Sequence, residues 1–171
     1  MVPQTLRVDL VGAFQPGVYA RDLGFKLSRD LTSGRLGVEY DDRVVEFGGE
    51  ATAAMPVSER VALCNTLTEI GVNNVLFPPL SYTGEKIVGG IVSDDDARFE
   101  SRITLDLGAL GPQVALPGGP DRAVDIAAAV GRPVDQAVIG SCGSGMYEDF
   151  ERAAALVRGK TIAPNVRFFV V

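Results

Sequence analysis

A glycine-rich break between a short apolar run and a helical run, within residues 134–158, most constrains the fold of this chain. The apolar run at 134–139 is of the kind that a buried strand needs. The sequence Gly-Ser-Cys-Gly-Ser-Gly at 140–145 cannot continue a strand, and its glycines permit a tight turn and close approach of a ligand to the backbone. Apolar residues then recur at helical spacing until Gly159, which closes the helix. The sequence therefore predicts a strand, a turn and a helix in succession.

The predicted turn carries Cys142 at or just before a helix that begins between Ser144 and Glu148. A helix N-terminus favours the thiolate of a cysteine, which is the form that binds metal or attacks carbon. The same backbone could hold a carboxylate or phosphate, so Ser141, Gly143 and Ser144 are candidate anion-binding residues. The turn matches neither G-x-G-x-x-G nor the P-loop. A small cysteine that merely fills a tight turn is the alternative.

Elsewhere, apolar periodicity predicts alternating strands and helices, which indicates an α/β fold. Strands are expected at 6–11, 75–77, 103–107, 113–116 and 166–171, and a hairpin is expected over 36–47 around Asp41 and Asp42. Helices are expected at 19–31, from an N-cap at Ser58 to Ile70, and, as a short helix, near 87–92. Residues 121–130 are expected to form either a short helix or an irregular linker.

Composition excludes several classes of function. The 171 residues carry a formal charge of −6, which argues against non-specific nucleic-acid binding. Without histidine, this chain cannot form a Ser-His-Asp or Cys-His catalytic site, nor a histidine-ligated metal site. Two cysteines and no signal-peptide pattern indicate a reducing cytoplasm. No run approaches the length that spans a membrane.

Asn65 and Glu69 form a second candidate site. Their i, i+4 spacing places both on one face of the predicted helix. That face differs from the apolar stripe of Leu63, Leu67 and Ile70, which would pack on the core. A solvated helix face is the alternative interpretation of the pair.

Two segments of the chain resemble the aconitase and isopropylmalate isomerase superfamily. Residues 139–154, IGSCGSGMYEDFERAA, and the strand that follows are similar to the segment around the family's first cluster cysteine. Residues 46–79 resemble the family's helix that contains Cys-Asn, with a glutamate four residues after the asparagine. Both segments occur in the family's order. Relatives have Thr-Asn after the cysteine, where this chain has Gly143 and Ser144.

The resemblance implies that Cys142 is a ligand of a 4Fe-4S cluster held by three cysteines, with one iron free to act on substrate. The family's other two ligands form a Cys-x-x-Cys pair, which this sequence lacks, and Cys64 matches a cysteine that is not a ligand. We therefore expect no cluster in the isolated chain and a cluster only with a partner chain. The resemblance also places Asn65 and Glu69 in the active site, with Glu69 as an acid–base group.

The resemblance further implies a layered α/β domain with a mixed sheet flanked by helices over residues 1–116. Residues 117–171 would open a second, cluster-cysteine unit of strand, turn, helix and strand. The sequence Pro-Gly-Gly-Pro at 117–120 is the best boundary signal.

The function implied is that of a subunit or fragment of a hydro-lyase acting on a hydroxy-di- or tricarboxylate. A partner polypeptide would supply the Cys-x-x-Cys pair and a swivelling domain, or copies of the chain would form a homo-oligomer. Two alternatives stay open. One is a stand-alone, cluster-free domain that binds a small carboxylate and isomerises or decarboxylates it with Glu69 and Cys142. The other is a non-catalytic assembly module.

Overall fold

A four-stranded parallel sheet forms the centre of the larger part of the molecule. The computed structural model describes residues 2–79, 85, 87–143 and 145–171. The strand order is β3-β2-β1-β4, and every neighbouring pair is parallel. The strands are β1 (Thr5–Val11), β2 (Val44–Gly48), β3 (Asn74–Leu76) and β4 (Ser101–Asp106). The predicted α/β class is confirmed, although the sheet expected to be mixed is parallel throughout.

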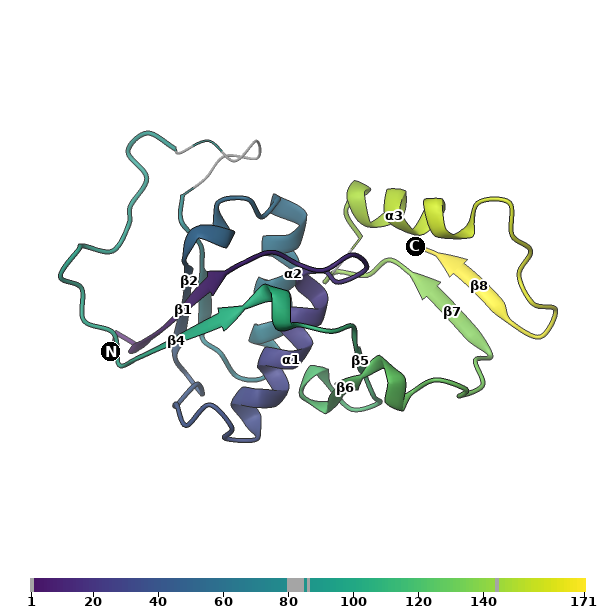
Figure 1. Cartoon of the computed structure of the whole chain (residues 1–171), viewed down its shortest axis with the longest axis horizontal. Helices are drawn as coiled ribbons and strands as arrows, with labels where there is room; N and C mark the ends of the chain where they lie inside the picture. The colour runs from purple at the N-terminus through teal and green to yellow at the C-terminus, as the bar shows by residue number, and fades with distance from the viewer. Residues whose placement is uncertain (1, 80–84, 86, 144) are drawn as a thin grey trace.

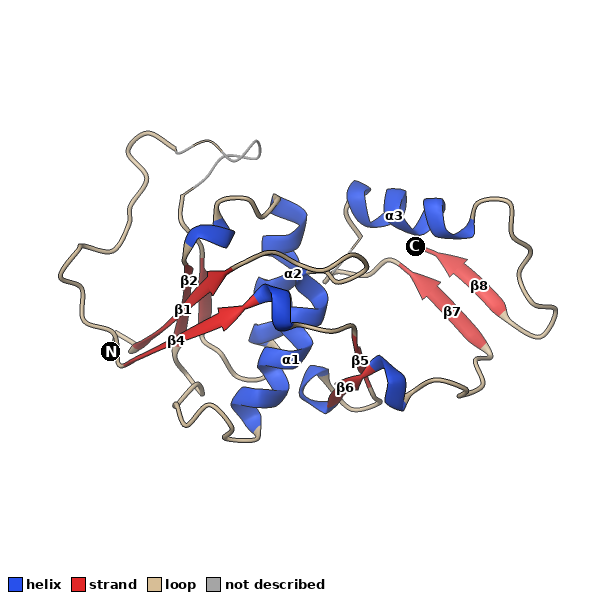
Figure 2. Cartoon of the chain, viewed as in Figure 1, coloured by secondary structure: helices blue, strands red, loops and turns tan. Residues whose placement is uncertain are grey.

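Helices α1 (Ala20–Thr32) and α2 (Val57–Thr68) lie together on one face of this sheet (Figures 1 and 2). Alternate residues of the strands are fully buried toward the helices, where they meet the predicted leucine stripes. The main members of this core are Leu6, Val8, Leu10, Val45, Phe47, Leu23, Leu27, Leu31, Leu63 and Leu67. The core therefore sits between the sheet and the two helices.

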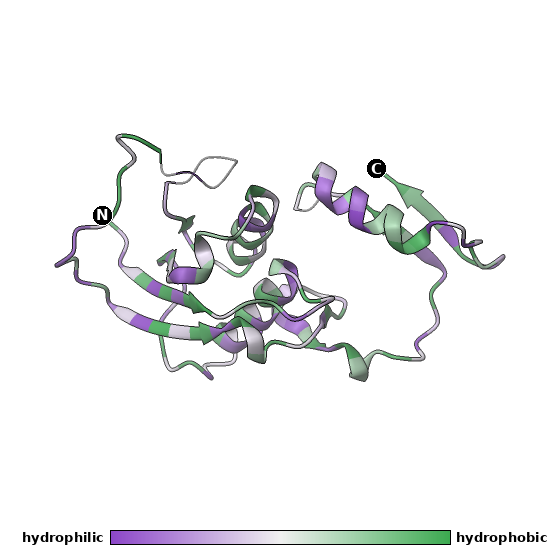
Figure 3. Cartoon of the chain, turned by 45° about the horizontal axis from the view of Figure 1, so that its top comes forward, coloured by the Kyte–Doolittle hydropathy of each residue, from purple (hydrophilic) through white to green (hydrophobic). Residues whose placement is uncertain are grey.

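The opposite face of the sheet carries charged side chains instead. Arg7 donates to Asp9 over 2.8 Å and also to Glu46, and Arg102 lies 3.7 Å from Asp9. The alternation of polar and apolar residues along β1 and β4 is visible in Figure 3. Both guanidinium groups also stack near the Phe99 ring. These ion pairs occupy a face that parallel sheets usually cover with helices.

A small hairpin packs against α1. Its strands β5 (Gln113–Ala115) and β6 (Ala123–Asp125) are antiparallel. Within 121–130, where a short helix or an irregular linker was expected, the chain therefore forms a short strand flanked by 3-10 helical turns. The short 3-10 helices are η1 (Glu50–Thr52), η2 (Leu107–Ala109), η3 (Pro120–Arg122) and η4 (Ile126–Ala128). The sequence 117–120 lies inside this hairpin connection. The division at residue 117 stays a proposal.

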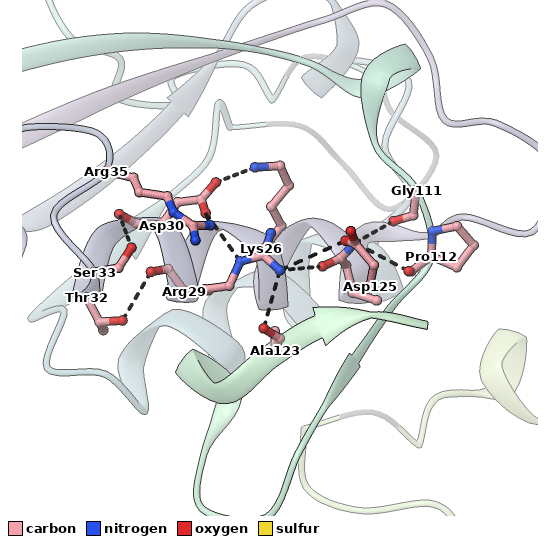
Figure 4. A network of polar contacts seen from close by, with 11 residues as sticks. Lys26, Arg29, Asp30, Thr32, Ser33, Arg35, Gly111, Pro112, Ala123 and Asp125 are labelled. Carbon is pink, nitrogen blue, oxygen red and sulfur yellow. Dashed lines mark hydrogen bonds and ion pairs between the residues drawn. The ribbon is translucent and has the colours of Figure 1, made fainter. Parts of the chain in front are cut away.

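A polar network fastens the hairpin to α1, as Figure 4 shows. Arg29 donates to the Gln113 side chain and to the Ala123 carbonyl, each over 3.3 Å. Next to it, Asp30 is only 6% exposed and pairs with Lys26, with Arg29 and, at 3.2 Å, with Arg35. Burial by itself would raise the pKa of Asp30, but the hydrogen bonds and charges of Lys26 and Arg29 outweigh it and lower the pKa.

Asp30→Asn should destabilise the fold by about 2 kcal/mol at pH 7, because the substitution removes a buried carboxylate that accepts charge-assisted hydrogen bonds from Lys26, Arg29 and Arg35. The contribution of a carboxylate with a lowered folded pKa is complete above its unfolded pKa of about 3.9 and is lost as the pH falls through the folded value. The difference in the free energy of unfolding between Asp30→Asn and the wild type, measured by urea unfolding, should therefore become smaller below about pH 4. Asp95→Asn, at an exposed carboxylate, is the control. An equal difference at pH 7 and pH 3 would contradict this account.

The predicted hairpin over 36–47 is wrong. Only Val44–Gly48 is a strand, and β2 is already paired on both sides by β1 and β3. The residues before it cannot pair with it, and Val38 and Tyr40 instead pack, partly buried, against the core.

Two helix predictions also need correction. Helix α2 is capped by Pro56, whose carbonyl accepts from the first turn, while Ser58 is buried inside that turn. The helix ends at Thr68 rather than Ile70. The short helix expected at 87–92 is a turn, in which the Gly90 amide donates to the Ile87 carbonyl.

The second unit follows the predicted order of strand, turn, helix and strand. Strand β7 (Gln136–Ile139) pairs in parallel with β8 (Arg167–Val170), and α3 (Tyr147–Val157) connects them. Figure 1 shows β7, α3 and β8 grouped at the C-terminal side of the molecule. No residue of α3 is fully buried.

Candidate functional site

The cysteine turn, residues 140–146, links β7 to α3. Cys142 is exposed in it, and α3 begins at Tyr147, inside the predicted bounds. Ser141 has a φ of 135°, a conformation that non-glycine residues rarely adopt. Asp149 caps the helix by accepting from the Met146 amide at 3.2 Å. The placement of Cys142 at a strand-to-helix turn is therefore confirmed.

Side chains of α1 and α2 hold this turn. The amide of Asn65 donates to the Cys142 carbonyl over 3.1 Å. Arg21 donates to the next carbonyl, that of Gly143, and its other terminal nitrogen donates to Thr66 Oγ1 at 3.0 Å. Two consecutive carbonyls of the turn are thus bonded to two different helices.

A pocket of about 350 Å³ opens at this junction. It is lined by the predicted residues Asn65, Glu69, Ser141, Cys142 and Gly143, together with Arg21, Phe25 and Thr66. Five of the six candidate residues therefore come together from segments more than seventy positions apart. The sixth, Ser144, lies outside the described residues.

Asn65 and Glu69 differ in what they contact. Asn65 is half-buried, and its amide is engaged by the turn. Glu69 is the exposed C-cap residue of α2, and in the described part of the chain its carboxylate makes no hydrogen bond or ion pair. The carboxylate therefore faces the pocket with its acceptor oxygens available to a ligand.

Arg21 supplies the positive charge of the pocket. Burial lowers the pKa of its guanidinium, and the nearby charges of Asp149 and Cys142 oppose that lowering. Sequence reasoning missed this residue, because nothing local distinguishes it from other arginines of an amphipathic helix. The one available signal is Gly24 three positions later, which is typical of a close helix contact.

The chain by itself does not fit a complete iron–sulfur cluster. Cys142 can offer one thiolate at the pocket. Cys64 is half-buried on α2, burial raises the pKa of its thiol, and its sulfur lies 4.0 Å from the Val75 carbonyl. Among the described residues, no group of three or more His, Cys, Asp or Glu could hold a metal ion. The chain by itself therefore offers one thiolate at the pocket, where the cluster implied by the resemblance needs three.

A larger hollow, of about 850 Å³, lies on the helix-free face of the sheet. Its arginines, Arg7 and Arg102, are engaged by Asp9 and Glu46. It is also lined by Asp94 and Asp95, and none of the candidate site residues that the structure describes lines it.

Comparison with known proteins agrees with this fold. The model of the aconitase family (aconitate hydratase) matches residues 1–85. The chain is similar to the aconitase superfamily, and its parallel α/β fold agrees with that similarity.

The similar curated proteins narrow the relationship. The 3-isopropylmalate dehydratase large subunit 1 of Methanopyrus kandleri is 38% identical over 177 residues, which cover 99% of this chain and 41% of that protein. The 3-isopropylmalate dehydratase large subunit of Methanoregula boonei is 34% identical, and the match covers 99% of this chain and 42% of that protein. The large subunit of Geotalea uraniireducens is 36% identical, and the match covers 96% of this chain and 42% of that protein. The chain thus spans about two fifths of the length of these relatives. Within the described residues, no helix is long and apolar enough to cross a membrane.

Proposed function

We propose that this chain is part of an aconitase-superfamily hydro-lyase that removes and re-adds water on a hydroxy-di- or tricarboxylate. The observation that carries the proposal is the pocket in which Glu69, Asn65 and Cys142 meet from separate segments. The relatives' names, which specify dehydration of 3-isopropylmalate, support the same reaction class. We place the protein in the cytoplasm.

Each side chain has a distinct role in this proposal. Glu69 exchanges a proton with the substrate hydroxyl or with the departing water, because its carboxylate is available in the pocket. Asn65 holds the cysteine turn through the Cys142 carbonyl. Ser141 and Gly143, with Ser144 assigned from the sequence alone, bind a substrate carboxylate near the N-terminus of α3.

Cys142 would contribute one thiolate to a 4Fe-4S cluster. When bound, such a cluster supplies an open iron that acts as a Lewis acid on a hydroxyl. In this proposal a partner polypeptide supplies the other thiolates and the swivelling domain, and a homo-oligomer of the chain is the alternative assembly.

The exposed apolar surface of the second unit supports a need for further polypeptide. Val138 on β7, Leu156 on α3 and Phe169 on β8 are exposed, at 59%, 68% and 44%. A two-stranded sheet with such a surface is only marginally stable in water, so another chain segment that covers it would stabilise it.

The isolated chain should bind far less than four iron atoms per monomer after anaerobic reconstitution, because it has only two cysteines. Iron and sulfide analysis measures this, and Cys142→Ala should remove the residual iron while Cys64→Ala should not. Near-stoichiometric four-iron content would refute the expectation. Residual iron that elutes with an oligomer would identify another copy as the source of the missing thiolates.

A stand-alone, cluster-free carboxylate-binding domain is the second candidate function. The observation that favours it is that the pocket, with Glu69 and Cys142, is already formed in this chain. Turnover by iron-free protein would favour it. Turnover that requires iron and a complementing large-subunit segment would favour the hydro-lyase.

A further inference from the structure

The close crossing of α1 and α2 sets the position of Arg21. A Cβ placed on Gly24 would lie 3.0 Å from the Thr66 side chain, so any larger residue would push the two helices or Thr66 apart by a few tenths of an ångström. Arg21 is three residues before Gly24 and therefore lies on the same side of α1. The crossing thus brings the guanidinium to Thr66.

Thr66 is a fixed acceptor for this guanidinium. Its hydroxyl donates its one proton to the Ala62 carbonyl at 2.6 Å, so its lone pairs are left for Arg21 Nη1 at 3.0 Å. Thr66 is 2% exposed and sits inside α2. Because the guanidinium is planar and rigid, anchoring Nη1 also fixes the direction in which Nη2 donates.

The second branch of the guanidinium reaches the cysteine turn. Nη2 donates to the Gly143 carbonyl, and Asn65 holds the preceding carbonyl at 3.1 Å. Two bonds from different helices to adjacent peptide units determine the orientation of the turn. The unusual φ of Ser141 needs such support, because a strained backbone persists only where its surroundings determine it.

We infer that Arg21 is a positioning residue that locks the cysteine turn in the orientation in which Cys142 faces the pocket. Only the expected effect of Arg21 on catalysis rests on the proposed function; its expected effect on the order of the turn does not. Arg21 is not assigned to substrate, because both of its terminal nitrogens are engaged by protein oxygens.

The test measures the order of the turn in the chain alone. Arg21→Met keeps an unbranched stem and removes both donors. The ¹⁵N order parameters of residues 141–143 should fall from about 0.85 to below about 0.6, while those of β1 and α2 stay unchanged. Arg21→Lys should give intermediate values, because one ammonium group cannot make both bonds in the same geometry. Thr66→Val should loosen the turn, and Thr66→Ser should not.

Arg152→Met is the matched control. Arg152 also joins the two units, through Glu59 at 2.9 Å and over the Tyr19 ring at 4.6 Å, but it does not bond the turn. It should leave the order parameters at 141–143 unchanged. Equal loosening by Arg152→Met and Arg21→Met, or no loosening by Arg21→Met, would overturn the inference.

The completed enzyme provides a second readout. There, Arg21→Met should lower kcat about 10-fold or more with little change in KM, because a misplaced turn affects the reacting geometry more than substrate affinity. Arg21→Lys should recover part of the loss. Absence of hydro-lyase activity in the wild-type assembly would refute the proposed function, whereas the order parameters would still decide the role of Arg21.

Discussion

Replacing Glu69 with Gln is expected to lower turnover of the completed hydro-lyase about 100-fold or more, because the amide cannot exchange a proton as a general acid or base. The free energy of unfolding should change by about 0.5 kcal/mol or less, since the carboxylate is exposed. Steady-state turnover with a complementing large-subunit segment and urea unfolding of the chain measure the two effects.

Glu39→Gln provides the matched control for this substitution. It makes the same change at an exposed glutamate that does not line the pocket, and both turnover and stability should stay at wild-type values. Full turnover of Glu69→Gln would mean that Glu69 belongs to a solvated helix face. A matching loss of stability would mean that its role is structural.

Gly49→Ala should destabilise the fold by about 4 kcal/mol or more, which is a large fraction of the stability of an ordinary domain. Gly49 follows β2 with a φ of 83°, and a Cβ there would lie 2.3 Å from the carbonyl oxygen and 2.6 Å from the nitrogen of Leu10. Leu10 belongs to the central strand β1, which cannot move away without breaking its pairing with β2 and β4. Urea unfolding at pH 7 measures the effect.

Gly34→Ala separates backbone strain from steric overlap. Gly34 has a similar φ of 71°, but a Cβ there meets nothing within 4 Å. Its substitution should cost only about 1 kcal/mol. If both variants lose the same stability, contact with the Leu10 backbone is not what requires glycine at position 49.

Periodicity predicted the elements that bury a regular stripe. Leu23, Leu27 and Leu31 identify α1 because residues four positions apart lie on the same face of a helix, and here that face packs on the core. The same reasoning failed for Val38 and Tyr40, whose alternation reflects burial of a loop against the core rather than strand pairing. Alternation reports which side chains are buried, and it does not report what the backbone bonds to.

The candidate site was predictable only where residues are close in sequence or match a family pattern. The placement of Asn65 and Glu69 on one helix and of Cys142 on a turn follows from local spacing. The contact of Arg21 with Gly143 joins positions 122 residues apart, and no local pattern encodes it. The N-cap was misplaced for a similar reason, because Ser58 has the preferred side chain but Pro56 has the extended backbone that begins α2.

The pocket has one wall from α1 and α2 and the other from the cysteine turn. A ligand that touches both walls must bind most tightly when the turn is docked. Docking here means contact of the cysteine turn with α1 and α2. If docking raises the affinity for the ligand by some factor, thermodynamic linkage requires that a bound ligand raise the docking equilibrium constant by the same factor. A ligand present at 100 times its dissociation constant would add about 2.7 kcal/mol to the docked state. Substrate occupancy and attachment of the β7–α3–β8 unit are therefore two readouts of one equilibrium.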